Sequence, residues 1–180
     1  MKTIFIFFSI LLTAATSLAQ KSGYINFTTV GILAGTSADD HAAPVSFVME
    51  HHYRFMNILA PGIFTGIEQL NENVMPVGAN LKLILPGKRC KFFTGLMAGY
   101  SVSLEKPKMG EIKVSKAGGG FLAGTEIGLL VAVNSCSSVV IALGYRYNEL
   151  NYKLEDWWLG NYTRKIVYNR FSFRMGIAFD

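Results

Sequence analysis

The dominant pattern of this chain is the alternation of large apolar residues with small or polar ones. It is clearest at residues 164–179, where every second position from 171 onward is large and apolar: Phe171, Phe173, Met175, Ile177 and Phe179. Successive side chains of a strand point to opposite faces, so this spacing predicts a β-strand with one apolar face and one polar, small-residue face. Strands of soluble proteins show the same alternation, so the pattern alone does not identify the surrounding solvent.

Similar segments recur along the whole chain, separated by polar or turn-forming stretches. We expect eight strands, at residues 23–36, 44–54, 62–70, 75–85, 91–104, 118–131, 139–150 and 164–179. The imperfect alternation of the first predicts a β-bulge near Thr28–Gly31. The connections after the second, fourth and sixth strands are short, whereas residues 105–117 and 151–163 are expected to be long loops. Strands of about ten residues with short turns at one end and longer loops at the other are typical of an all-β, antiparallel up-and-down barrel.

Residues 1–19 have the features of a cleaved signal peptide. Lys2 precedes an apolar run at residues 4–12, and Ser17-Leu18-Ala19 offers small residues for cleavage before Gln20. We therefore expect one domain, residues 20–180, that is exported from the cytoplasm.

The amino-acid composition limits the environments in which that domain could reside. Hydrophobic residues make up 51% of the chain, yet no apolar stretch after the leader approaches the length of a membrane-spanning helix. A closed barrel is the other way to satisfy the backbone in lipid. The formal charge of +5 is spread along the chain without a dense basic face, so nucleic-acid binding is not expected.

The last alternating strand ends in an aromatic residue, Phe179, one position before the chain end. One family of membrane proteins shares this feature. Together with the strand pattern, it makes the mature chain resemble the small outer-membrane β-barrels of the OmpA/OmpX-like type, as found in Bacteroidota envelopes. Asp180 departs from the usual terminal aromatic. The resemblance implies an eight-stranded transmembrane barrel in the outer membrane, contacting lipid and lipopolysaccharide and inserted by the barrel-assembly machinery. It also implies a structural or surface-interaction role, with no enzymatic activity and no cofactor.

Eight ionisable residues fall on the face opposite the apolar one, and in a barrel they would point inward. They are Glu50, His52, Arg54, Glu68, Lys82, Glu126, Arg146 and Arg174. An unpaired buried charge costs several kcal/mol, so we expect an interior ionic network. Two other functions remain open: a narrow channel or small-solute transporter that uses these charges, and a soluble periplasmic lipocalin-like barrel that binds a ligand. Glu50 and His52 could act as an acid–base pair, but no nucleophile accompanies them, so catalysis is not expected.

Two further pairs of residues stand out. Trp157 and Trp158 fall in the expected loop 151–163, where they are possible extracellular contacts, if they do not fold down onto the barrel. Cys90 and Cys136 fall at the same end of the barrel, at the start of one strand and just before another, and are a possible disulfide. Neither cysteine has the spacing of a metal site.

Overall fold

The computed structural model describes residues 23–36, 44–55, 58–70, 72–104, 113–116, 118–156 and 160–180. These residues contain nine β-strands, which pair in antiparallel fashion. The strands are β1 (Tyr24–Thr36), β2 (Val45–Tyr53), β3 (Leu59–Gln69), β4 (Asn73–Ile84), β5 (Cys90–Ser103), β6 (Lys113–Lys116), β7 (Gly120–Ala132), β8 (Ser137–Asp156) and β9 (Gly160–Phe179). No helix in these ranges is both long and apolar enough to cross a membrane.

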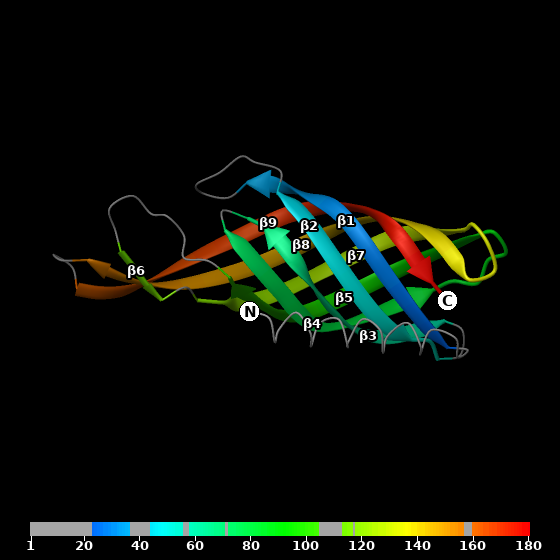
Figure 1. The fold of residues 1–180 in the computed structure, drawn as a ribbon, viewed down its shortest axis with the longest axis horizontal. Coiled ribbons are helices and arrows are strands. Elements are labelled where there is room, and N and C mark those ends of the chain that lie inside the picture. Colours follow the sequence, from blue (N-terminus) through cyan, green and yellow to red (C-terminus); the bar gives the residue numbers. More distant parts are fainter. Residues whose placement is uncertain are drawn as a thin grey trace, which may run out of the picture.

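Eight of these strands close into a barrel. Each of β1 to β5, β7, β8 and β9 pairs with its neighbour in chain order, and β9 pairs with both β8 and β1, which completes the circle (Figure 1). Following the paired residues from Ile25 once around the barrel returns to β1 at Gly35, ten residues farther along. The strands are therefore steeply staggered, as closure of a small barrel requires. The eight-stranded prediction is confirmed.

The connections differ between the two ends of the barrel. The β2–β3, β4–β5 and β7–β8 connections lie at the end where β9 finishes at Phe179, which we call the turn end. The long β8–β9 hairpin lies at the opposite end, which we call the hairpin end (Figure 1). The short connections predicted after the second, fourth and sixth strands all lie at the turn end.

The predicted bulge and one of the predicted loops are wrong. The bulge expected near Thr28–Gly31 is absent, because the β1 pairing runs without interruption to β2 on one side and to β9 on the other. The expected loop 151–163 is largely strand: β8 continues to Asp156, β9 begins at Gly160, and the two pair throughout. The polar residues of this segment predict a loop, but the two strands stay paired with each other beyond the last pairing of β9 with β1.

Part of the expected loop 105–117 is also a strand. β6 pairs along the edge of the extended part of β8, with Lys113 opposite Glu155 and Val114 opposite Leu154. A short strand bearing lysines at a sheet edge is a common way of limiting further pairing. The prediction of a loop fails here because four residues give too short an alternation to be recognised.

The outward face of the barrel is apolar over its whole circumference. The large residues that the alternation assigned to this face are exposed, among them Phe92 at 62%, Ile127 at 63% and Phe171 at 69%. Every barrel strand contributes such residues. A monomer in water rarely exposes an apolar surface of this extent, whereas lipid tails would cover it.

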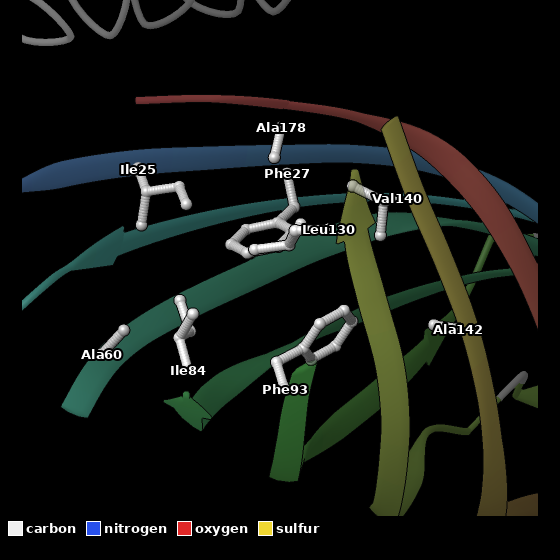
Figure 2. Close-up of a cluster of buried hydrophobic side chains, with 9 residues drawn as sticks. All are labelled: Ile25, Phe27, Ala60, Ile84, Phe93, Leu130, Val140, Ala142 and Ala178. Atoms are coloured by element: carbon white, nitrogen blue, oxygen red, sulfur yellow. The ribbon is translucent and has the colours of Figure 1, made fainter. Parts of the chain in front are cut away.

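The interior is not uniformly polar, which the sequence reasoning missed. At the turn end, an apolar cluster fills the barrel, with side chains from β1, β3, β4, β5, β7, β8 and β9 pointing toward one another (Figure 2). A second cluster lies toward the hairpin end: Leu33, Leu70, Val74, Leu150, Tyr152, Ile166 and Tyr168. The buried ion pairs lie between these two clusters, next to a third apolar cluster of Val48, Phe64, Met97 and Leu122. The sequence of β1 indicates these apolar layers, because β1 has apolar residues on both of its faces. For the same reason its alternation is imperfect.

Candidate functional site in the barrel interior

Two carboxylates and two cations form the centre of the interior. Arg174 of β9 donates from Nη1 to Glu50 of β2 at 3.0 Å and from Nη2 to Glu126 of β7. Lys82 of β4 lies 3.0 Å from the Glu50 carboxylate and also pairs with Glu126. Each cation thus bridges both carboxylates, and all four side chains are at least 97% buried. The formal charges of the four groups cancel.

His52 and Asn80 complete the bonding around Glu50. The Nε2 atom of His52 lies 3.0 Å from the Glu50 carboxylate, and its Nδ1 atom lies 2.9 Å from the carbonyl oxygen of Ala60. The amide of Asn80 donates to the same Glu50 oxygen at 2.6 Å. Gly62 faces the His52 ring so closely that a Cβ there would lie 2.5 Å from Nδ1, so the glycine makes room for the imidazole. The contacts fix His52 as a structural partner of Glu50.

Aromatic rings separate this centre from the turn end. The ammonium of Lys82 lies 4.8 Å from the ring centroids of both Phe27 and Phe93. The faces of aromatic rings attract cations, so the two rings add to the stabilisation of Lys82. Both rings belong to the apolar cluster of Figure 2, which therefore packs directly against the charged centre.

A second ion pair lies farther toward the hairpin end. Arg146 of β8 pairs with Glu68 of β3, whose carboxylate also accepts a hydrogen bond from Ser46 at 3.1 Å. The other terminal nitrogen of Arg146 lies 3.2 Å from the sulfur of Met97. Both charged side chains are at least 97% buried. Of the eight predicted interior residues, seven are thus inside the barrel in paired positions.

Arg54 is the exception, and its interior placement is corrected. Its guanidinium lies at the rim of the turn end and pairs with Asp180, which also lies 3.8 Å from the ammonium of Lys91. Arg54 follows the last residue of β2, so the inward direction predicted by alternation leads to the mouth of the barrel rather than to its centre.

Arg170 is a buried cation that the sequence reasoning missed. Its Nη1 donates to the carbonyl oxygen of Leu33 at 3.2 Å, and its guanidinium lies 5.4 Å from the ring centroid of Tyr168. The alternation that put Ser172 and Arg174 on the inward face of β9 extends to residues 170 and 168, so continuing it in the N-terminal direction would have found both.

His51 lies on the outward face of β2, near the turn end. Its Nδ1 atom contacts the hydroxyl of Tyr24 and lies 3.2 Å from the amide nitrogen of Asn26. The hydrogen-bonding partners explain how an imidazole is tolerated on an otherwise apolar face. The pairing of β2 with β1 and β3 is regular at this point, so the outward position of His51 is not caused by a bulge.

One ion pair belongs to the hairpin beyond the last pairing of β9 with β1. Lys165 lies 2.8 Å from the carboxylate of Glu149. The hydrogen bond from Lys165 lowers the pKa of Glu149, and the same bond raises the pKa of Lys165. A lowered acid pKa and a raised base pKa both favour the charged pair, which should therefore persist between the ordinary values of about 4.3 and about 10.4 and weaken outside them.

The two cysteines do not form the possible disulfide. Cys90 and Cys136 are free and exposed in the structure. Cys90 is the first residue of β5, opposite Val131, whereas Cys136 lies beyond β7 in the connection to β8. Location at the same end of the barrel therefore does not bring the two thiols together.

Two free thiols give a direct prediction. Folded, unreduced protein should take up two maleimide groups per chain, and its mobility on a non-reducing gel should not change on addition of reductant. Reduced protein labelled in parallel is the control. Maleimide uptake that depends on prior reduction would instead establish a disulfide.

Some predicted sites lie outside the described residues. They are the signal peptide, residues 1–19, and the possible contacts Trp157 and Trp158. Within the described ranges, no cluster of three or more histidine, cysteine or acidic residues could hold a metal ion.

Solved structures with this architecture were found by comparison. The outer membrane protein OprG from Pseudomonas aeruginosa matches with a TM-score of 0.68 and 12% identity over 88% of this chain and 96% of that one. This is the fold of the small eight-stranded outer-membrane β-barrels. Neisserial surface protein A matches with a TM-score of 0.61 and 13% identity, over 88% of this chain and 97% of that one.

A third match is the N-terminal β-barrel domain of Pseudomonas aeruginosa OprF, with a TM-score of 0.54 and 9% identity over 89% of this chain and 98% of that domain. No family model and no curated protein matches the chain. The resemblance to outer-membrane barrels stated from the sequence is thus confirmed at the level of the fold, and the narrower Bacteroidota type stays a prediction.

Proposed function

We propose that the chain is an integral outer-membrane β-barrel with a structural or surface-interaction role and no catalytic activity. The observation that carries this proposal is the combination of an apolar outward face with an interior in which the buried acids are paired with cations and apolar clusters fill both ends. The turn end would face the periplasm and the β8–β9 hairpin the outside, since short turns are characteristic of the periplasmic side of such barrels. The hairpin, in whose sequence Trp157 and Trp158 fall, would then be the surface that contacts partners outside the cell.

The interior geometry argues against the two alternative functions. A lipocalin-like barrel needs a polar outside and an apolar cavity, whereas here the outside is apolar and the middle of the interior is ionic. A channel needs a continuous aqueous path, whereas Phe27, Phe93 and their neighbours pack across the turn end (Figure 2). Ion pairs between these layers would serve to hold the strands together.

Two measurements test the proposal. The protein should appear in the outer-membrane fraction and migrate differently on a gel when unheated and when boiled, as closed barrels do. A soluble periplasmic protein without a mobility shift would contradict membrane insertion. Reconstituted in planar bilayers, the protein should show no discrete conductance steps. Reproducible steps that change when Lys82 is replaced by alanine would instead establish a channel through the charged centre.

A further inference from the structure

A groove runs across the outward face of the barrel near the turn end. It has a volume of about 520 Å³, within the range of about 300–1,000 Å³ typical of small-molecule sites. Its lining includes one row of paired residues across four strands: Leu83 on β4, Thr94 on β5, Ile127 on β7 and Leu143 on β8. Thr94 has the smallest side chain of these four residues. Apart from this hydroxyl, the side chains that line the groove are apolar.

A basic turn adjoins the groove. Leu85 is a lining residue, and the β4–β5 connection that begins there continues through Lys88 and Arg89 before returning at Phe92, another lining residue. Lys88 and Arg89 are both exposed, and neither side chain pairs with an acid in the described part of the chain. The nearby Lys91 differs, because it faces Asp180 at the rim. The turn itself contains no acidic residue.

We propose that this groove and turn form a binding site for one anionic glycerophospholipid of the leaflet that the turn end contacts. An acyl chain would lie in the groove, where it matches the apolar lining, and the phosphate-bearing headgroup would reach Lys88 and Arg89. Basic residues at the end of a membrane-spanning element attract anionic headgroups, at about 1 kcal/mol for each charge, or about five-fold in affinity. This proposal depends on the membrane location proposed above.

Native mass spectrometry of the full-length protein in detergent tests the site, after a heat-dependent gel shift has shown that the barrel is folded. With phosphatidylglycerol or phosphatidylcholine added at equal concentration, the protein should retain one phosphatidylglycerol in preference to phosphatidylcholine. The double variant Lys88→Gln/Arg89→Gln should lose about 25-fold in phosphatidylglycerol retention, since two charges worth about five-fold each are removed. Thr94→Trp, which fills the groove, should reduce the retention of both lipids.

Matched controls separate a specific site from general lipid contact. Arg164→Gln/Lys165→Gln removes the same charge at the hairpin end, and Thr65→Trp adds the same side chain to the outward face of β3; both should retain lipid as the unaltered protein does. Equal retention of the two lipids, or unchanged retention in both test variants, would overturn the proposal. A protein that shows no heat-dependent gel shift and stays in the soluble fraction would refute the membrane proposal itself, which is a different result.

Discussion

Replacing Glu126 with glutamine should lower the free energy of unfolding by about 3–5 kcal/mol, the usual cost of removing one partner of a buried ion pair. Glu126 accepts from both Lys82 and Arg174, and glutamine keeps its size but removes its charge. Glu50 would then have to balance two cations alone. The fraction of protein that keeps the folded gel mobility, followed against urea concentration in lipid vesicles, gives this free energy.

A second substitution distinguishes charge imbalance from simple loss of contacts. Lys82→Met in the Glu126→Gln protein removes the excess cation and places a thioether between Phe27 and Phe93, a favourable neighbour for aromatic rings. The double variant should recover much of the lost stability, so the effects of the two single substitutions should not add. Purely additive losses would contradict an electrostatically coupled centre. Glu149→Gln, in the exposed pair of the hairpin, is the control and should change little.

Replacing Gly78 with valine should destabilise the barrel by about 3 kcal/mol, at the upper end of the usual cost of overpacking. Gly78 of β4 lies directly opposite Gly99 of β5. A Cβ at Gly78 would lie 2.3 Å from the carbonyl oxygen of Ala98 and 2.8 Å from the ring of Phe64. The first of these is a backbone atom, which cannot rotate away, so the strands themselves would have to shift.

The matched control for this change is Ala79→Val, because Ala79 is the next residue of β4 and faces outward. It should leave the urea midpoint close to that of the unaltered protein, whereas Gly99→Val should lower the midpoint as Gly78→Val does, since its Cβ would lie 2.3 Å from the carbonyl oxygen of Val77. Equal stability of the Gly78 and Ala79 variants would contradict close approach of the two strands.

Alternation determined most of the architecture from the sequence alone. The number of barrel strands, their approximate bounds and the outward direction of residues such as Phe171 and Phe173 all follow from a period of two, because a strand offers only two faces. The same parity put Glu50, Lys82, Glu126 and Arg174 inside. Whether a residue occupies an odd or an even position along its strand can be read from the sequence of that strand alone, without knowing which strands pair with it.

Only the tertiary structure decided which of these side chains meet. Which inward residues share a level depends on the ten-residue stagger around the barrel, and the sequence of one strand does not contain the register of another. That stagger brings Glu50 to Arg174 and separates Glu68 and Arg146 as a pair of their own. The same register places Phe27 and Phe93 beneath Lys82, and extends β8 and β9 beyond the barrel. These features depend on how segments distant in the sequence pair with one another, and no local sequence pattern determines that pairing.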